Sequence, residues 1–232
     1  MPEIQQYQPE DAAQPPSLHP AYVSTIARSP HQPLVRIPQT LSEITGPTDW
    51  SALMGGSMAD LTKRHAGEPQ GQRIIVSGRV LDESHRPVPN TVIEIWQANA
   101  AGRYCHKKDQ WDAPLDPNFT GAGRVITDAE GRYRYVTVRP GAYPWGNHYN
   151  AWRPSHIHLS LLGPAFATRL VTQMYFPDDP LILIDPIASA VPEPYRQRMV
   201  SRFDLETTMP NWALGYLFDI VLRGPAATPM GL

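Results

Sequence analysis

The 232-residue sequence predicts an all-β protein, a β-sandwich with long loops, an extended N-terminal arm and few short helices. Several segments are rich in β-branched and aromatic residues and alternate between apolar and polar side chains, as half-buried strands do. Proline accounts for 26 residues, about twice its usual share, which argues against a helical bundle. Strand signals recur at short intervals with few helical patterns between them, and this favours two packed sheets.

Residues 1–72 are expected to form an extended arm rather than a compact unit. Prolines recur along this segment, and no helical or two-residue apolar period is sustained. About the first 15 residues should be disordered, whereas the apolar residues of 24–38 could pack along a body or a partner. The β-sandwich domain is then expected to comprise residues 73–232.

The strand signals begin at residue 73. Segment 73–82 is rich in β-branched residues, and segment 91–98 places Val, Glu and Trp on one face and Ile, Ile and Gln on the other. Segment 124–138 is expected to be a hairpin with D-A-E-G (128–131) as its turn. The remaining strands are predicted at 156–163, 169–176 and 214–224, which makes at least seven, and the best short helix at 194–201.

Four side chains indicate a metal site: Tyr104, Tyr143, His156 and His158. Residues i and i+2 of a strand face the same way, so the two imidazoles can reach one ion. Imidazole suits iron, copper and zinc alike. A free phenol has a pKa of about 10, so a tyrosine binds at neutral pH only to an ion acidic enough to remove its proton. Two phenolates and two imidazoles therefore favour ferric iron, with a fifth position for solvent or substrate.

Two other kinds of metal site are weaker hypotheses. A three-histidine zinc site or a cupin-like site needs a further histidine or a nearby acid after the H-x-H pair. No histidine follows His158 in the sequence, and the next glutamate is Glu193. Asp178 and Asp179 come closer, but they lie in a proline-flanked turn, so a ferrous site with two histidines and one carboxylate is the weaker interpretation.

The spacing of the four candidates and the segments around them resemble a known family. Tyr143 follows Tyr104 by 39 residues, His156 comes 13 residues later, and His158 is two residues further on. The flanking segments read E-I-W-Q-A-N-A-A-G-R-Y (94–104), A-P-L-D-P-N-F-T-G-A-G-R (113–124), R-P-G-A-Y-P-W (139–145) and W-R-P-S-H-I-H (152–158). These features resemble the intradiol ring-cleaving dioxygenases, and the likeness extends from about residue 20 to residue 224.

The resemblance implies roles for particular residues. It implies one non-haem Fe(III) per chain, held by the four candidates, with Tyr143 as an axial ligand that dissociates during turnover and His158 as the other axial ligand. Arg153 would stabilise negative charge on the substrate ring, as an oxyanion-hole donor does. The substrate pocket implied by the resemblance contains Tyr22, Trp96, Trp145, Arg153, Gln173 and Ile187.

The resemblance also implies a substrate and a partner. Members that act on plain catechol have a helical N-terminal dimerisation region, and residues 1–72 show no such helices. The likeness is therefore greater to members that cleave 3,4-dihydroxybenzoate with O2 to 3-carboxy-cis,cis-muconate in aromatic catabolism. Their iron-bearing chain pairs with an α subunit in a hetero-oligomer. The arm around Tyr22, Arg28 and His31 is the candidate site for the substrate carboxylate.

Two alternatives to this function stay open. The chain could be an intradiol enzyme for another substituted catechol, namely 4-sulfocatechol, gallate, hydroxyquinol or catechol itself. It could also be a non-catalytic structural subunit of the kind represented by the α chains of the family, although keeping all four candidate ligands argues against that interpretation.

Composition excludes several classes of partner. The formal net charge is −2 with no block of like charges, which gives no support to nucleic-acid or anionic-membrane binding. No apolar stretch approaches membrane-spanning length and no leader-like segment is seen, so we expect a cytoplasmic protein. The single cysteine, Cys105, fits a reducing compartment. No nucleotide-binding motif is present, so no organic cofactor is expected, and the six other histidines are expected on the surface or in loops.

Overall fold

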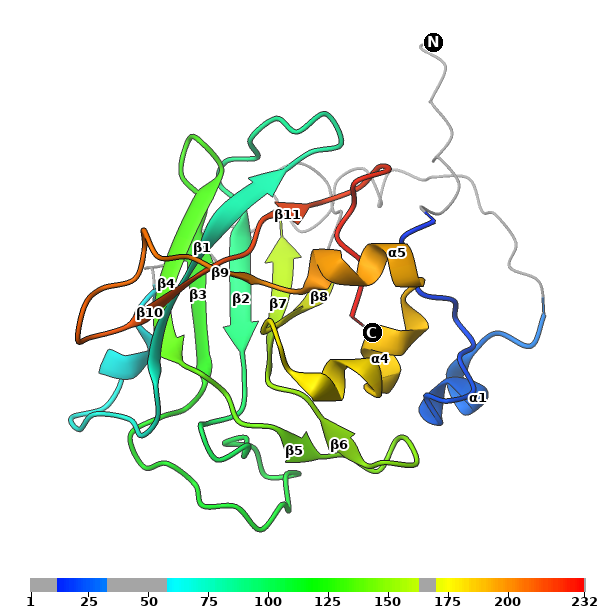
Figure 1. Cartoon of the computed structure of the whole chain (residues 1–232), viewed down its shortest axis with the longest axis horizontal. Helices are drawn as coiled ribbons and strands as arrows, with labels where there is room; N and C mark the ends of the chain where they lie inside the picture. The colour runs from blue at the N-terminus through cyan, green and yellow to red at the C-terminus, as the bar shows by residue number, and fades with distance from the viewer. Residues whose placement is uncertain (1–11, 33–57, 163–169, 232) are drawn as a thin grey trace.

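The computed structural model contains two β-sheets, with short helices gathered beside one of them (Figure 1). It describes residues 12–32, 58–162 and 170–231. In the first sheet β1 (Arg73–Leu81) lies between β4 (Arg132–Val138) and the successive strands β10 (Leu214–Leu217) and β11 (Ile220–Val221), and β9 (Arg202–Phe203) flanks β10. The second sheet has the order β3 (Ala122–Ile126), β2 (Val92–Trp96), β7 (His156–Leu162), β8 (Leu170–Tyr175). A separate two-stranded ribbon pairs β5 (Tyr143–Pro144) with β6 (Trp152–Arg153).

The apolar core lies between the two sheets because each strand directs alternate side chains inward. Ile74 and Val76 of β1 belong to the same buried cluster as Ile93 and Ile95 of β2 and Leu159 of β7. Each such side chain contributes roughly 1.5–3 kcal/mol by leaving water. The predicted β-sandwich is confirmed.

The outer face of the second sheet carries a different set of side chains. His156 and His158 alternate with core residues along β7, so both point away from the core. In the strand register, His158 lies opposite Trp96 of β2 and Gln173 of β8, and His156 lies opposite Tyr175 of β8. Side chains of directly paired residues share a face. The sheet therefore presents a compact row of aromatic and polar groups on its outer side.

Short helices follow β8 in the chain and lie beside it in Figure 1. They are η2 (Pro180–Leu183), α4 (Pro186–Ala190), α5 (Glu193–Arg196) and η3 (Gln197–Met199), and the arm helix α1 (Ser24–Arg28) lies on the same side. Asp185 begins α4, where its carboxylate accepts a hydrogen bond from the Ala188 amide, and Pro186 occupies the first helical position. Capping fixes the start of this very short helix.

Most strand predictions agree with the structure to within one or two residues. The predicted strands at 73–82, 91–98, 156–163 and 169–176 correspond to β1, β2, β7 and β8, and the helix predicted at 194–201 corresponds to α5 and η3. Segment 214–224 forms two short strands instead of one. The break comes where the Phe218 amide donates to the Ser77 carbonyl and Asp219 accepts from the Arg79 amide.

The predicted hairpin at 124–138 is wrong. The turn itself forms, because the Gly131 amide donates to the Asp128 carbonyl at 3.0 Å. However, β3 pairs with β2 and β4 pairs with β1, so this segment crosses from one sheet to the other. Alternation shows that a strand buries one face, but it does not identify the neighbouring strand. Here Tyr133 and Tyr135 of β4 stack on each other within the core at 6.3 Å between ring centroids.

The arm is described in two parts. Most of the segment expected to be disordered, and the part of segment 24–38 after residue 32, lie outside the described residues. Residues 12–32 include α1, and residues 58–72 include η1 (Leu61–Lys63), whose Leu61 is buried in the main core. The domain boundary at residue 72 stays a prediction. Within the described ranges, no helix has the length and apolarity needed to cross a bilayer.

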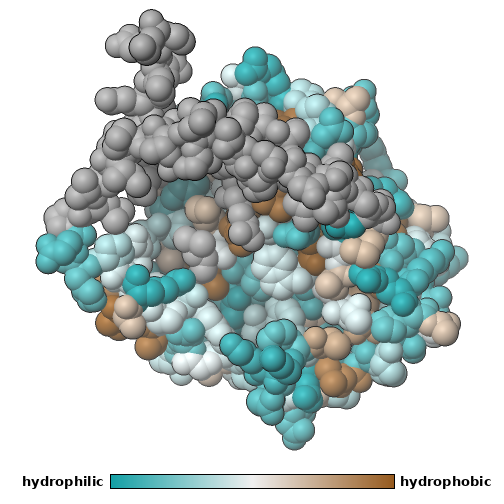
Figure 2. All heavy atoms as spheres, turned by 180° about the vertical axis from the view of Figure 1, so that it is seen from behind, coloured by the Kyte–Doolittle hydropathy of each residue, from teal (hydrophilic) through white to brown (hydrophobic). Residues whose placement is uncertain are grey.

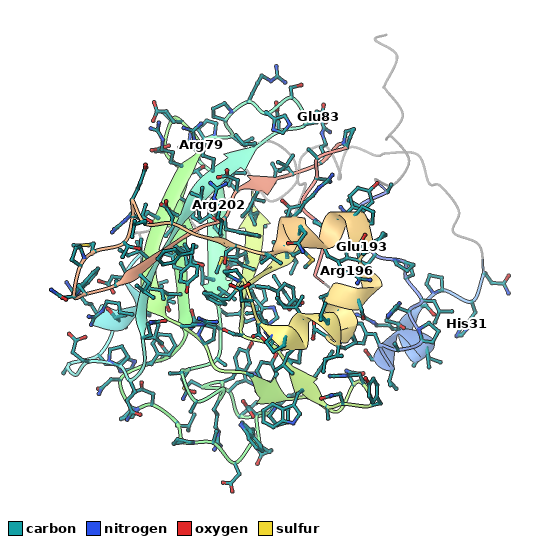
Figure 3. The ribbon with its side chains drawn as sticks, viewed as in Figure 1. His31, Arg79, Glu83, Glu193, Arg196 and Arg202 are labelled. Atoms are coloured by element: carbon teal, nitrogen blue, oxygen red, sulfur yellow. The ribbon has the colours of Figure 1, made fainter. Side chains whose placement is uncertain are left out.

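The face of the molecule seen from behind is mainly hydrophilic over the described residues, with apolar ones scattered among them (Figure 2). The charged side chains of Arg79 and Glu83 lie near the upper edge of the fold in Figure 3. Single exposed apolar residues are normal on a protein surface.

Candidate metal centre

The four candidate ligands lie together beside the outer face of the second sheet. Ring centroids are 5.4 Å apart for Tyr104 and Tyr143, 5.4 Å for Tyr143 and His156, 4.8 Å for His156 and His158, and 6.4 Å for His158 and Tyr104. The four rings thus form a closed circuit. Two phenols and two imidazoles face one another although Tyr104 and His158 are 54 positions apart in the sequence.

The loop that carries Tyr104 is held by side chains that accept hydrogen bonds from its backbone amides. Asn99 organises it, since its side-chain oxygen accepts from the amides of Ala101 and Arg103 at 3.0 and 2.9 Å. The Tyr104 amide donates to the Asp109 carboxylate at 2.8 Å. Gly102 has φ +82°, and a Cβ there would lie 2.1 Å from the carbonyl oxygen of Ala142. The loop before Tyr104 therefore touches the backbone immediately before Tyr143.

His156 presents one ring nitrogen to the centre. Its Nδ1 lies 2.7 Å from the Pro154 carbonyl oxygen, which can only accept, so Nδ1 carries the proton. Its Nε2 lone pair then faces the Tyr143 hydroxyl at 3.2 Å and Nη1 of Arg153 at 3.1 Å. Fixing the tautomer through the second nitrogen is the usual arrangement for a metal-binding histidine.

The electrostatics of the four residues fit a bound cation. Burial, reinforced by nearby positive charge, lowers the pKa of both His156 and His158 well below the usual range, so both imidazoles are neutral and able to ligate. Burial, with the neighbouring Tyr143, raises the pKa of Tyr104 well above its usual value. Among the described residues, the buried Tyr104 hydroxyl also has no hydrogen-bond partner. A cation here would satisfy this oxygen and favour its phenolate form.

The carboxylate-based alternatives have no support in the described residues. Within these ranges, no group of three His, Cys, Asp or Glu side chains is arranged to hold a metal ion. The Asp179 carboxylate is already used, since it accepts from the amides of Leu181 and Ser155. Asp178 sits in the turn with φ +65°.

Arg153 lies beside the four rings and is 2% exposed, unlike most arginines. Its Nη1 is 3.4 Å from the Tyr143 hydroxyl. Burial alone would lower the pKa of Arg153, but the carboxylate of Asp185 together with the phenols of Tyr175 and Tyr143 holds that pKa above its ordinary value. Arg153 therefore places a permanent positive charge at the edge of the centre.

The remaining pocket candidates on the sheet and ribbon surround this group. The Trp96 and His158 rings are stacked at 4.8 Å with an interplanar angle of 3°. Gln173 accepts from Nη2 of Arg153 at 2.6 Å, and the Trp145 ring lies 5.2 Å from the guanidinium carbon. The resemblance implied all three residues; Trp96 contacts one of the four rings directly, whereas Gln173 and Trp145 contact Arg153.

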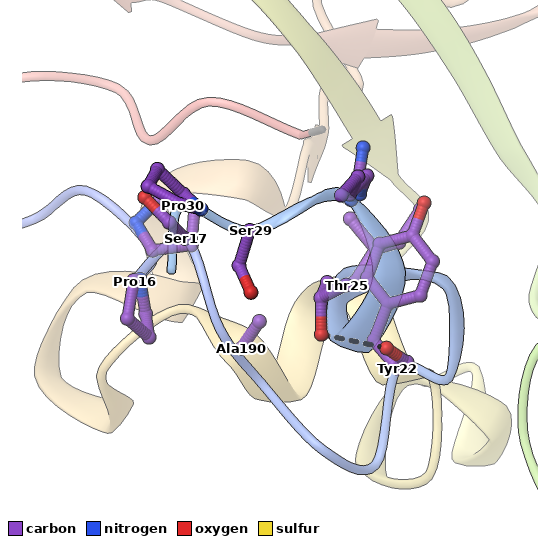
Figure 4. Close-up of a pocket in the computed structure, with 10 residues that line it drawn as sticks. Pro16, Ser17, Tyr22, Thr25, Ser29, Pro30 and Ala190 are labelled. Carbon is purple, nitrogen blue, oxygen red and sulfur yellow. Dashed lines mark hydrogen bonds between the residues drawn. The ribbon is translucent and has the colours of Figure 1, made fainter. Parts of the chain in front are cut away.

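The other two candidates, Tyr22 and Ile187, line a small cavity between the arm and α4 (Figure 4). Tyr22 from the arm and Ile187 from α4 line this cavity of about 190 Å³, and Arg28 lines it as well. The guanidinium of Arg28 lies 4.7 Å over the Tyr22 ring, and that ring lies 5.2 Å from Trp145. His31 is exposed beyond α1 and does not line the cavity (Figure 3).

The sequence interpretation missed three residues that shape the site. Asp185 binds the Arg153 guanidinium, and Tyr175 donates to Asp185 at 2.7 Å. Asn147 holds the arm in place, because its backbone and side-chain oxygens accept from the amides of Val23 and Ser24, both at 2.9 Å. The strand alternation could have placed Tyr175 beside Gln173, but nothing local indicated the partners of Asp185 or Asn147.

His148 lies in a loop, as expected, but is not solvent-exposed. Both of its ring nitrogens lack hydrogen-bond partners within the described ranges. Its ring lies 6.5 Å from that of Trp145, between centroids.

Comparisons with known proteins identify related sequences. A family model described as "Dioxygenase" matches residues 44–224, and one described as "Protocatechuate 3,4-dioxygenase beta subunit N terminal" matches residues 7–40. The chain is 59% identical over 218 residues to the protocatechuate 3,4-dioxygenase beta chain of Burkholderia cepacia, covering 93% of each chain. It is 28% identical to the alpha chain from the same organism, covering 70% of this chain and 78% of that one.

Solved structures share the fold. A hydroxyquinol 1,2-dioxygenase from Pseudomonas putida DLL-E4 is similar with a TM-score of 0.55 and 24% identity, over 71% of this chain and 59% of that one. A catechol 1,2-dioxygenase from Acinetobacter sp. ADP1 is similar with a TM-score of 0.52 and 25% identity, over 73% of this chain and 58% of that one.

Proposed function

The chain belongs to the intradiol ring-cleaving dioxygenase family, and on that premise we propose that it cleaves 3,4-dihydroxybenzoate (protocatechuate) with O2 between the two hydroxyl-bearing carbons. The product is then 3-carboxy-cis,cis-muconate. The observation that carries the proposal is the closed circuit of Tyr104, Tyr143, His156 and His158 in the spacing of the family.

The proposed cofactor is one non-haem Fe(III) ion per chain, held by these four residues. The neutral imidazoles and the unpartnered Tyr104 hydroxyl support a hard, strongly acidic cation at this position. Fe(III), when bound, supplies the Lewis acidity that lets phenols ionise at neutral pH and that activates the catechol toward O2.

The protein's own groups would then manage protons and charge. A catechol must lose two protons to bind as a dianion. The Tyr143 phenolate is the proposed acceptor of one proton, and a solvent hydroxide, which leaves as water, is the proposed acceptor of the other. Nη1 of Arg153, 3.4 Å from that oxygen, is placed to donate to negative charge that develops on the substrate. Trp145, Ile187 and the buried side chains around them would exclude water from the ring.

The proposed carboxylate site is in the arm. An unpaired buried carboxylate is costly, so a benzoate-type substrate needs a cation. Arg28 lines the cavity next to Tyr22 and makes no ion pair within the described part of the chain. The match of residues 7–40 to a protocatechuate-enzyme N-terminal model supports the same substrate class.

The proposed assembly is a hetero-oligomer with an α chain. The relative from Burkholderia cepacia is a beta chain, and the alpha chain from that organism is itself similar to this sequence. The α chain would complete the surroundings of the arm.

The deciding experiment is oxygen uptake by the purified protein, with and without a co-expressed α chain, against a panel of catechols. We expect stoichiometric iron, tyrosinate-to-iron absorption and the highest kcat/KM for 3,4-dihydroxybenzoate. A preference for 4-sulfocatechol would keep the reaction class and overturn the substrate. Yellow products of cleavage outside the diol, or a colourless protein with stoichiometric zinc, would refute the intradiol assignment itself.

A further inference from the structure

The guanidinium of Arg153 is gripped on one edge by a single carboxylate. Nε donates to Oδ1 of Asp185 at 2.8 Å and Nη2 donates to Oδ2 at 3.1 Å, a two-point geometry that only arginine offers. Nη2 also donates to Gln173 at 2.6 Å and to the Tyr175 hydroxyl at 3.2 Å. With Nε and Nη2 engaged, Nη1 is the nitrogen that remains directed at the four rings.

Nη1 meets the centre at two atoms, since it lies 3.1 Å from Nε2 of His156 and 3.4 Å from the Tyr143 hydroxyl. The guanidinium is planar and is held at Nε and Nη2, so Nη1 cannot change direction unless both hydrogen bonds to Asp185 break. The direction of Nη1 is therefore set by the carboxylate on the opposite side of the guanidinium.

The charge balance also depends on this pair. Side-chain exposure is 2% for Arg153 and 0% for Asp185, so neither group is solvated by bulk water. A buried guanidinium without a partner is unfavourable and tends to move toward water or another anion. Asp185 thus allows a cation to remain beside a cationic metal.

Asp185 is itself fixed from two sides. The Tyr175 hydroxyl donates to Oδ2 at 2.7 Å and the Ala188 amide donates to Oδ2 at 3.0 Å. Burial and the Asp185 charge raise the pKa of Tyr175 well above its usual value, so this phenol stays a donor. Asp185 therefore links the start of α4 to the orientation of Nη1. The same helix carries Ile187, which lines the cavity.

We propose that Asp185 is a positioning residue of the ring-cleaving site, which directs Nη1 of Arg153 at the reacting centre and balances its charge. This rests on the proposed function. The alternative to a positioning role is that Asp185 serves only as the N-terminal cap of α4. Asparagine caps a helix as well as aspartate does, so Asp185→Asn keeps the cap and the volume while it removes the charge and one acceptor.

The kinetic test is a double-mutant cycle in the iron-loaded protein with its α chain. Asp185→Asn is expected to lower kcat per bound iron about 10- to 100-fold, with KM for 3,4-dihydroxybenzoate changed less than about 3-fold. In an Arg153→Ala background the same substitution should lower kcat less than about 2-fold further, because its effect passes through the missing guanidinium. Wild-type kcat in Asp185→Asn, or a full additional loss in the double variant, would overturn the proposal.

Two further variants separate a positioning role from a general loss of stability. Asp60→Asn removes the charge of a capping aspartate on η1, which pairs with Val136 of the first sheet, and should leave kcat unchanged. Tyr175→Phe removes one donor to Asp185 and should lower kcat several-fold, again only when Arg153 is present. If Asp185→Asn does not fold, the Tyr175→Phe cycle decides, and an unchanged kcat there would overturn the proposal.

A second readout does not depend on activity. In a crystal structure of metal-free Asp185→Asn, Nη1 of Arg153 should have moved away from the Tyr143 hydroxyl, with the start of α4 in place. An unmoved guanidinium would refute the positioning role even if activity is lost. Absence of ring cleavage in the wild-type protein would instead refute the proposed function, and the displacement of Nη1 in the variant would still be measured.

Discussion

Replacing Gly102 with alanine is expected to damage the metal centre without touching a proposed ligand. Gly102 lies two residues before Tyr104, in the left-handed region at φ +82°. An added Cβ would lie 2.1 Å from the carbonyl oxygen of Ala142, which immediately precedes Tyr143. Both the backbone conformation and the space therefore require glycine.

The cost can be assembled from two contributions. A non-glycine residue in the left-handed region costs about 1–2 kcal/mol, and overpacking of a close contact costs about 1–3 kcal/mol. The sum of about 2–5 kcal/mol is a large fraction of a typical folding stability of about 5–15 kcal/mol. The loop can avoid part of this cost by moving away from Ala142, which separates Tyr104 from Tyr143.

The assay combines urea unfolding of the metal-free protein with iron titration followed by the tyrosinate absorption band. Gly102→Ala should lose about 2–5 kcal/mol of stability, or retain its stability and bind iron about 10- to 100-fold more weakly. Gly146→Ala is the matched control, since a Cβ added there would have no described atom within 4 Å and the variant should behave as wild type. Normal stability together with normal iron affinity in Gly102→Ala would refute the reasoning.

Three further outcomes are expected. Tyr104→Phe should reduce iron content or shift the absorption band more than Tyr143→Phe, which should retain iron but bind catechol slowly in stopped-flow traces; the reverse order would contradict the assigned roles. Because the pKa of His156 and of His158 is lowered from 6.5 in the folded chain, the unfolded chain binds more protons below that pH. The free energy of unfolding should therefore be highest above about pH 6.5 and should fall as the pH is lowered, by up to about 1.4 kcal/mol per pH unit for each histidine. Urea titrations of the metal-free protein measure this pH dependence, and an unaltered dependence in His158→Gln would contradict the expectation. Arg28→Ala should raise KM for 3,4-dihydroxybenzoate about 10- to 100-fold and leave KM for catechol nearly unchanged, whereas equal shifts for both substrates would remove Arg28 from the carboxylate site.

Local features of the sequence were enough for the strands and for the chemistry of the centre. Runs rich in β-branched and aromatic residues identified β1, β2, β7 and β8, and β2 also showed the two-residue alternation of a half-buried strand. The same period placed His156 and His158 on one face, and the acidity needed to ionise Tyr104 and Tyr143 indicated ferric iron. The grouping of the two tyrosines with the two histidines in one site rested instead on the resemblance to a family, because 39 residues separate Tyr143 from Tyr104.

Long-range pairing was decided only by the tertiary structure. The alternation of β3 and β4 was the same whether they paired with each other or crossed between sheets, so the hairpin could not be told from a crossover. Asp185 meets Arg153 across 32 positions, and Asn147 meets Ser24 across 123. In the sequence, Asp185 can be recognised as a helix cap and Asn147 as a polar loop residue, but the neighbouring residues do not indicate which distant group either one binds. A buried charge or amide must be satisfied by whichever partner the packing brings within reach, so the groups that direct Arg153 and hold the arm emerge only when the two sheets and the short helices have come together.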